Sequence, residues 1–140
     1  MSLASVFSIA GSGMAAETQR LTAVASNLAN ANSMADSSGQ PYRAREVVFR
    51  ALSSDGGDGT GPAETGMAGV EVAGIVASAA PLRRTYSPAS PFADAKGYIE
   101  MPNVNPIDEM VNMISAQRNY QADLEAFNVA KTLLMKTLAI

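Results

Sequence analysis

Apolar side chains recur at alternating spacings of four and three residues near the start of the chain. In a series of eight such positions running from residue 3 to residue 28, only Glu17 is not apolar. Positions spaced in this way lie on one face of a helix. The pattern therefore predicts a helix over residues 3–30 with a narrow hydrophobic seam, formed by Leu3, Phe7, Ala10, Met14, Glu17, Leu21, Val24 and Leu28.

Two glycines, Gly11 and Gly13, interrupt this predicted helix. Each weakens a helix by up to about 1 kcal/mol relative to alanine. They indicate a kink, a very close contact with another helix, or only poor residues in a frayed segment. The sequence leaves these three interpretations open.

The last part of the chain opens with the signals of a helix start. Asn105 stands at the N-cap position, Pro106 at the first helical position, and Asp108 and Glu109 beside the positive end of the helix dipole. No glycine or proline follows. The segment predicts a helix over residues 106–139, whose seam is apolar or aromatic at seven of nine positions: Met110, Met113, Gln117, Tyr120, Leu124, Phe127, Lys131, Leu134 and Leu138.

The middle of the chain has a different character. Residues 53–69 hold six glycines and one proline, which predicts a flexible loop. The valine-rich runs at 45–52 and 69–78 predict two strands on either side of it. A segment punctuated by prolines follows, which predicts extended chain with a short strand at 97–101.

These elements divide the chain into an N-terminal helix (1–33), a β-rich middle (34–105) and a C-terminal helix (106–140). At 1.5 Å per residue the two helices would be roughly 40 and 50 Å long, whereas a compact domain of this size has a radius of gyration of about 14 Å. We therefore expect a mainly α fold, in which the terminal helices pair as a coiled-coil-like hairpin, parallel or antiparallel, and the middle forms a small β-rich knob.

Pairing of the two helices would still leave apolar flanks in contact with water. Ala15, Ala25, Ile114 and Ala130 lie beside the seams and would add to an apolar surface that is too large for a soluble monomer. One interpretation is a monomer whose helices are shorter and folded back. The interpretation we favour is a subunit whose helices complete their burial against neighbouring subunits.

The stretch "SNLANANS" (residues 26–33) places three asparagines at the end of the first helix. Asparagine is a mediocre helix former and is costly to bury without partners. One interpretation is that all three are capping residues, with Asn32 ending the helix in a left-handed conformation. In the interpretation we favour, Asn27 and Asn30 lie beside the Leu28 seam and set the register of contacts between chains.

Little in the chain suggests catalysis. The sequence contains no cysteine and no histidine, which removes disulfides, thiol nucleophiles, zinc fingers and the commonest general base near neutral pH. Asp55 and Asp58 lack the ligand spacing of an EF-hand. An enzyme that uses Glu109, Arg118 and Tyr120 is a remaining alternative, although their spacing requires only packing and solvated charge. We expect no catalytic residue, no cofactor and no metal.

Charge and hydropathy also limit the partners. The net charge is −3 and only Arg83 and Arg84 form an adjacent basic pair, so we expect no nucleic-acid partner. The first charged residue is Glu17. A cleaved secretory signal would require a basic segment before the apolar stretch, and we identify none. That stretch is also too short and too rich in serine and glycine to span a bilayer.

Several motifs resemble the family of flagellar rod and hook proteins. An apolar N-terminal helix with "SGM" (12–14) that closes in "SNLANANS" resembles the N-terminal signature of that family, and "EMVNMISAQRNYQADLEAFNVAK" (109–131) resembles its C-terminal helix. The runs "GQPYRAREVVF", "GVEV" and "YSPASPFADAKGYIEMPNV" extend the likeness to rod members over nearly the whole chain.

The resemblance implies a structural subunit of the proximal rod of the bacterial flagellar basal body, located in the periplasm. It implies type III export without a cleaved signal peptide, and assembly through the terminal helices into a helical tube that transmits torque for motility. The implied partners are copies of the chain, other rod proteins and the junction of membrane ring and export gate at the rod base, with no nucleic acid and no small-molecule substrate. The alternatives are another rod protein of this family and a generic secreted coiled-coil assembly protein.

The predicted assembly interface consists of the seam residues and the two asparagines beside them. Its members are Leu3, Phe7, Met14, Leu21, Val24, Asn27, Leu28, Asn30, Met110, Met113, Gln117, Tyr120, Leu124, Phe127, Leu134 and Leu138.

Overall fold

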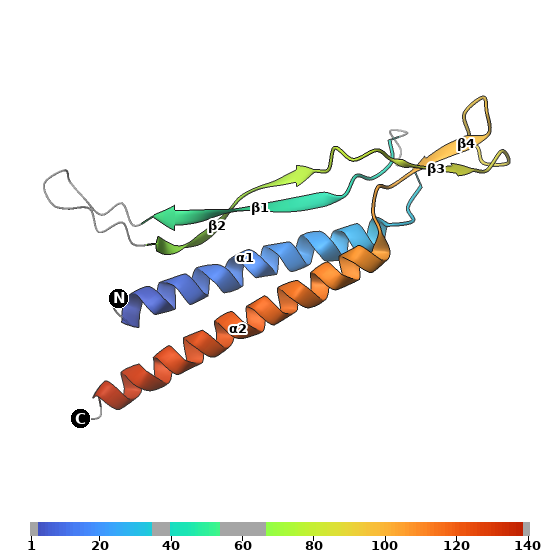
Figure 1. Cartoon of the computed structure of the whole chain (residues 1–140). Helices are drawn as coiled ribbons and strands as arrows, with labels where there is room; N and C mark the ends of the chain where they lie inside the picture. The colour runs from blue at the N-terminus through green and yellow to red at the C-terminus, as the bar shows by residue number, and fades with distance from the viewer. Residues whose placement is uncertain (1–2, 35–39, 54–66, 139–140) are drawn as a thin grey trace, which may run out of the picture.

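The chain forms a long, thin molecule with a helix at each end of the sequence (Figure 1). The computed structural model describes residues 3–34, 40–53 and 67–138. Its elements, in order, are α1 (Leu3–Asn30), β1 (Arg45–Ser53), β2 (Met67–Ala77), β3 (Arg83–Tyr86), β4 (Tyr98–Met101) and α2 (Pro106–Leu138).

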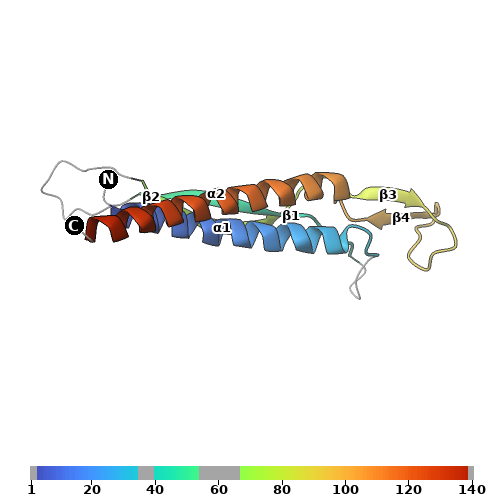
Figure 2. The ribbon, with the colours of Figure 1, turned by 90° about the horizontal axis from the view of Figure 1, so that it is seen from below.

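The two helices are antiparallel and lie side by side along their length (Figures 1 and 2). Phe7 of α1 contacts Phe127 of α2, and Asn27, five turns further along α1, bonds Glu109 at the start of α2. The two helix ends nearest the chain termini therefore lie at one end of the molecule, and the connection to the middle of the chain lies at the other.

The helices and the first sheet form three layers, with α1 in the middle. Strands β1 and β2 pair as an antiparallel two-stranded sheet that packs on the face of α1 opposite α2 (Figure 1). Among the described residues, both strands pack on α1 and neither packs directly on α2. Because α1 is covered on two sides, it buries more residues than α2.

The small β-rich middle expected from the sequence is confirmed, but its strands form two sheets spread along the molecule and not one knob. In the β1–β2 sheet the register shifts between Val48 and Phe49, where Ala73 is left without a partner. The second antiparallel sheet pairs β3 with β4 and projects beyond the helices, at the end opposite the helix ends nearest the chain termini (Figure 1). Each sheet has two strands, so it depends on helix packing or on local bonds for its order.

Most predicted elements are confirmed. Both helices have the expected bounds to within a residue, and strands occur at 45–53, 67–77 and 98–101. Strand β3 was not expected, since it lies in the proline-punctuated segment. Most of the predicted glycine-rich loop, residues 54–66, lies outside the described residues. The antiparallel pairing of helices is observed, and coiled-coil packing between them stays a prediction.

The end of α1 differs from the expected left-handed cap. Among the described residues, only glycines have positive φ, so Asn32 does not end the helix in a left-handed conformation. Instead the chain leaves α1 through a turn, in which the Ser33 backbone N–H donates to the Asn30 carbonyl oxygen at 3.1 Å.

The best-buried apolar cluster lies where the middle of the chain meets the helices. Ala31, Ala44 and Val104 form it, and Tyr42 packs against it. These residues follow α1, precede β1 and precede α2, so the cluster joins all three. The buried apolar side chains of the helices are small, mostly alanine. No helix among the described residues is apolar enough over a sufficient length to cross a bilayer.

Candidate assembly interface

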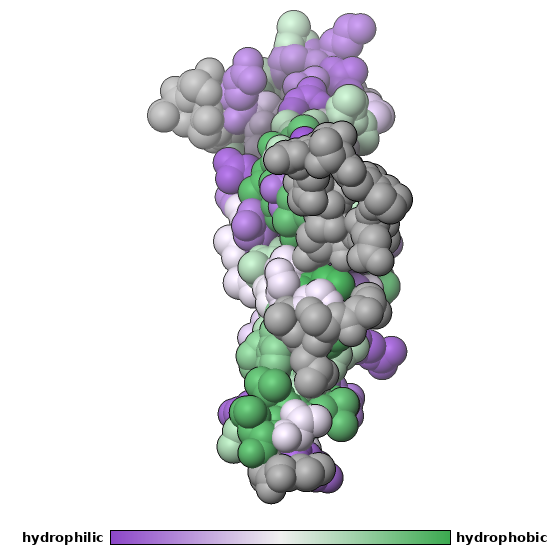
Figure 3. Space-filling view, turned by 90° about the vertical axis from the view of Figure 1, so that its left-hand side faces the viewer, coloured by the Kyte–Doolittle hydropathy of each residue, from purple (hydrophilic) through white to green (hydrophobic). Residues whose placement is uncertain are grey.

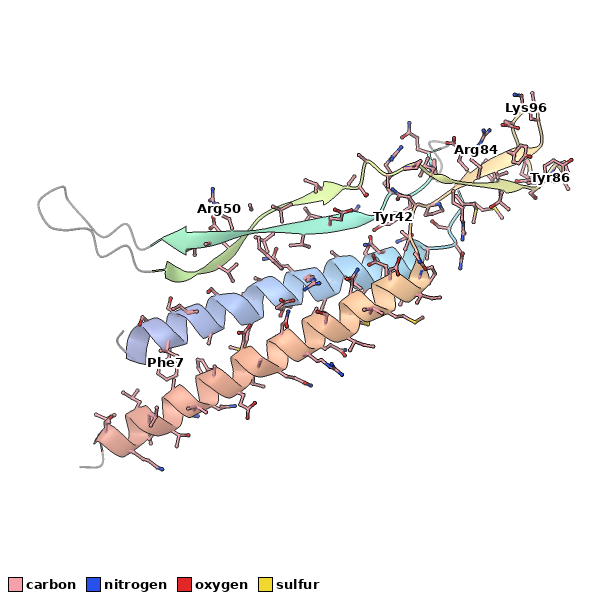
Figure 4. All side chains as sticks on the ribbon, viewed as in Figure 1. Phe7, Tyr42, Arg50, Arg84, Tyr86 and Lys96 are labelled. Carbon is pink, nitrogen blue, oxygen red and sulfur yellow. The ribbon has the colours of Figure 1, made fainter. Side chains whose placement is uncertain are left out.

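On α1, the predicted interface residues lie on the covered faces. Val24 is buried, and Met14, Leu21 and Leu28 are partly buried. The Phe7 ring points toward α2 and meets the Phe127 ring edge to face, with 4.8 Å between the centroids (Figure 4). The side chain of Leu3 is outside the described set. These α1 side chains therefore bury most of their apolar surface within the subunit.

On α2, the predicted residues divide into two groups. Met113, Tyr120 and Phe127 are partly buried on the face toward α1. The other predicted residues stay exposed to solvent: Met110, Gln117, Leu124, Leu134 and Leu138. The structure thus brings the first group into the helix pair and leaves the second group free for other contacts.

The division arises because the face of α2 that packs on α1 contains alanines that were not among the predicted seam positions. The expectation that Ala130 lies on an exposed flank is wrong, because the helix pair buries it. Ala116 and Ala130 are 0% and 3% exposed, and each lies one residue before a predicted seam position. Alanine permits a close approach of two helices but adds little to a hydrophobic pattern. In the sequence, this contact face could have been recognised only by its spacing of seven residues, which Glu109, Ala116, Asp123 and Ala130 share.

The face of α2 that points away from α1 carries an apolar strip at its start. The outer strip consists of Ile107, Met110, Val111 and Ile114, and each of these side chains is more than half exposed. Their spacing of i, i+3, i+4 and i+7 is that of an amphipathic helix whose apolar face is covered. In the subunit alone, nothing among the described residues covers it.

A second exposed apolar region lies at the C-terminal end of α2. Val129, Leu133, Met135 and Leu138 are all at least half exposed there. Figure 3, which looks onto the end of the molecule where the chain termini lie, shows hydrophobic residues gathered in its lower part, where α2 ends. A shallow apolar groove of about 430 Å³ lies beside them, between α2 and Val6 of α1.

Asn27 joins three segments at the other end of the helix pair. It is 2% exposed. Its Nδ2 donates to the Arg45 carbonyl oxygen at 2.9 Å and to Glu109 Oε2 at 3.0 Å. Its Oδ1 accepts from the Tyr42 hydroxyl at 2.9 Å and from the Arg45 N–H at 2.8 Å. Both donors and both acceptor positions of the amide are therefore used inside the subunit.

The other two asparagines of the motif make fewer bonds, and only that of Asn30 is local. Asn30 Nδ2 donates to the Ser26 carbonyl oxygen of its own helix at 2.8 Å, and Asn32 Oδ1 accepts from Arg83 at 3.3 Å. Asn27 therefore sets the register between segments of one chain. A role of Asn27 or Asn30 in contacts between chains stays a prediction.

The start of α2 is fixed by two further asparagines. Asn105 Oδ1 accepts from the Ile107 N–H at 3.1 Å, as expected for the N-cap. Asn103 Oδ1 accepts from the Ala44 N–H at 2.8 Å, and its Nδ2 donates to the Ala80 carbonyl oxygen at 3.0 Å. The bonds of Asn103 connect the segment before α2 to the segments before β1 and after β2. They therefore fix the orientation of the first turns of α2, which carry the outer strip.

Polar side chains also occur between the helices. Asn119 Nδ2 of α2 donates to Glu17 Oε1 of α1 at 3.0 Å. One turn away, the carboxylate of Asp123 lies against Gly13, where a Cβ atom would come within 2.5 Å of Oδ2. Gly13 is therefore a site of close helix contact, whereas Gly11 has open space around it. Burial, and then the charge of Glu17, raise the pKa of Asp123.

The projecting β3–β4 sheet ends in a tip with exposed aromatic rings (Figure 4). Asp94 organises the turn: its Oδ1 accepts from the N–H groups of Lys96 and Tyr98 at 2.8 and 2.9 Å, and Oδ2 pairs with Arg84 at 2.7 Å. The Tyr98 backbone bond is the largest cause that lowers the pKa of Asp94. The rings of Tyr86 and Tyr98 meet edge to face.

The arrangement is suited to packing. Among the described residues, no three acidic side chains are grouped so as to hold a metal ion. The residues of the enzyme alternative do not converge: Glu109 bonds Asn27, Arg118 is exposed, and Tyr120, two positions away, is partly buried toward α1. Paired terminal helices with uncovered apolar strips are typical of a structural protein that assembles with other subunits. We assign this chain to that class.

Comparisons with known proteins agree with that class and narrow it. The model of the family described as "Flagella basal body rod protein" matches residues 7–33, and "Flagellar basal body rod FlgEFG protein C-terminal" matches residues 95–140. Similar proteins named "Flagellar basal-body rod protein FlgC" occur in Yersinia enterocolitica (50% identical), Escherichia coli O6:H1 (49%) and Borreliella burgdorferi (36%). Each alignment covers 100% of this chain and 98% of the relative.

The chain therefore belongs to the FlgC family of flagellar basal-body rod proteins. It is a structural subunit of the flagellar basal body, which confirms the resemblance found in the sequence and the expectation of a structural, non-enzymatic role.

Proposed function

We propose that this subunit forms part of the proximal rod and helps to transmit torque through a helical tube of subunits. In this proposal the subunit contacts copies of itself and other rod proteins, and it reaches the junction of membrane ring and export gate at the rod base. It enters the periplasm by type III export without a cleaved signal peptide. Support comes from the family and from the exposed apolar surfaces of α2.

The outer strip is the observation that carries the proposal. Burying an apolar side chain of this size contributes about 1.5–3 kcal/mol, so four of them left in water represent a large unused driving force for association. An amphipathic helix with an uncovered i, i+3, i+4, i+7 face is a common recognition element in protein grooves. In the assembled rod, we infer, neighbouring subunits cover the outer strip and pack α1 and α2 into coiled-coil contacts.

The shape of the subunit favours an open, helical arrangement. The outer strip and the exposed C-terminal region of α2 lie near opposite ends of the same helix. A contact between two different surfaces that does not close into a ring generates a helix of subunits. Alanine and methionine suit such contacts, because alanine permits close approach and methionine adapts to neighbours that are not identical.

A charge placed in the outer strip tests this function. We expect Ile114→Asp to abolish swimming in soft agar, because the carboxylate would be buried against a neighbour at a cost of several kcal/mol. Cellular amounts of the subunit should stay unchanged, since Ile114 is exposed in the subunit alone.

The matched control is Gln121→Asp, which adds the same charge two turns further along the same outward face, where the chain is already polar. This variant should swim. Deletion of the gene should abolish swimming and the rod without slowing growth. If Ile114→Asp subunits assemble into rods and support normal swimming, the outer strip is not an assembly surface.

A further inference from the structure

A groove of about 420 Å³ runs between α1, α2 and the β1–β2 sheet. Its walls are mostly small or apolar, and two carboxylates, Glu17 and Asp123, open into it. The other side chains that matter for its chemistry are Ile9, Phe49, Val70 and Ala122. The groove is thus an apolar channel with a negatively charged wall.

Glu17 is only partly satisfied within the subunit. The residue is 8% exposed, and its Oε1 accepts from Asn119 Nδ2 at 3.0 Å. Its Oε2 is buried and accepts no hydrogen bond from the described residues. Arg20 Nη1 lies 3.6 Å from that oxygen, which is within range of an ion pair but too long for a hydrogen bond. A buried carboxylate oxygen left in this state costs free energy.

Asp123 is even less compensated. Among the described residues it has no hydrogen bond and no ion pair with a cation. Its carboxylate is admitted to this position by Gly13, because a Cβ atom there would lie 2.5 Å from Oδ2. Burial of the site, and then the charge of Glu17, raise the pKa of Asp123, which agrees with two negative groups facing one cavity.

We propose that this groove receives a lysine or arginine side chain from a neighbouring rod subunit, whose cationic group lies between Glu17 and Asp123. The inference rests on the proposed function, because it needs a neighbour. The apolar walls favour a protein side chain over a free ion: the aliphatic stem of lysine or arginine would pack along Ile9, Phe49 and Val70, while the head group meets the carboxylates.

The proposal predicts effects of opposite sign in the free and the assembled subunit. In the isolated subunit, Asp123→Asn removes a repulsive, partly desolvated charge, so the helical circular dichroism signal should persist to a higher urea concentration. In purified rods the same change removes the partner of a cation. As the salt concentration is raised, we expect the variant subunit to be retained in rods about tenfold less well than the unchanged subunit. A loss of this size is typical of one charge-assisted hydrogen bond. The matched control is Glu125→Gln, which removes an exposed carboxylate on the same helix and should change neither quantity.

Unchanged retention of Asp123→Asn subunits in rods would overturn the proposal, and so would destabilisation of both the isolated subunit and the rod, which indicates a role within the subunit. A photoreactive benzoylphenylalanine at the exposed Ala122 identifies the occupant. The expected crosslink joins residue 122 to a peptide of a neighbouring subunit, and that peptide contains a lysine or arginine next to the crosslinked residue. Dissociation of rods by a metal chelator, without such a crosslink, would point to an inorganic cation and reject the proposal. Because Ile114 lies outside this groove, its variant tests the proposed function separately.

Discussion

Asn27 does at one position what a hydrophobic residue could not do. It lies in the most buried part of α1, and its four hydrogen bonds reach Tyr42, Arg45 and Glu109. An apolar side chain there would fill the space but leave the N–H and carbonyl groups at the start of β1 without partners. The amide therefore couples the position of the β1–β2 sheet on α1 to the position of α2.

We predict that Asn27→Ala lowers the free energy of unfolding by about 2–4 kcal/mol, because it leaves several buried polar groups unpaired at once. Asn30→Ala is the control, since within the described part of the chain that amide bonds only the Ser26 carbonyl oxygen of its own helix. The control should cost less than about 1 kcal/mol. Urea titrations of the isolated subunits, followed by helical circular dichroism, measure both. Equal losses would mean that the asparagine motif acts only through the helix end.

The sequence indicated that these asparagines are special, but it could not show which one matters most or to what it binds. Asn27 and Glu109 are separated by 82 positions, and nothing local links them. Asn105 was easier, because an N-cap bonds within its own turn. Local hydrogen bonds can be predicted from neighbouring residues, whereas bonds that depend on the packing of distant segments cannot.

At the scale of elements, helix α2 shows how far hydrophobic periodicity reaches. It predicted the helix and its bounds. Of the seam positions that it gave, Met113, Tyr120 and Phe127 lie on the face toward α1, whereas the others named in the interface stay exposed. It did not identify Ala116 and Ala130 as the most buried positions of α2, because a pattern built on the largest apolar residues favours the neighbouring positions. Strand β3 was missed for a related reason: four exposed residues, "RRTY", carry no alternation to detect.

The close contact at Ala116 gives a prediction for the helix pair. Ala116→Leu adds three carbon atoms where the side chain is 0% exposed, so the helices must separate or the leucine must adopt a strained rotamer. We expect a loss of about 1–3 kcal/mol in the free energy of unfolding. Ala126→Leu adds the same atoms at an exposed position of α2 and should change this free energy by less than about 0.5 kcal/mol.

Urea unfolding of both variants decides the matter. The Ala116→Leu chain should also pack Phe7 against Phe127 less tightly, which shifts the aromatic ring signals in NMR spectra. A fully stable Ala116→Leu subunit would show that the two helices are not in close contact at residue 116.

At the scale of the whole molecule, the bonds that hold the subunit together are distributed unevenly. Asn27, Asn103, Asn105 and the Ala31 cluster all lie at the end where α1 leads into the middle of the chain and α2 begins. At the opposite end, every described residue of α2 from 131 onward is exposed. One end is therefore built as a rigid junction, and the other depends on what packs against it.

This gradient predicts how hydrogen exchange differs between the free and the assembled subunit. Local stability follows buried apolar contacts, so in the isolated subunit the amides of residues 131–138 should exchange much faster than those of residues 109–116. In rods, neighbours that cover the exposed side chains should slow exchange more at 131–138 than at 109–116, where Asn27 and the buried Ala116 already hold the helix in the isolated subunit. Peptides from β1, which packs on α1, serve as the internal reference. Uniform protection along α2 in the isolated subunit would mean that the helix needs no neighbour for its order, and the exposed C-terminal side chains would lose their role in assembly.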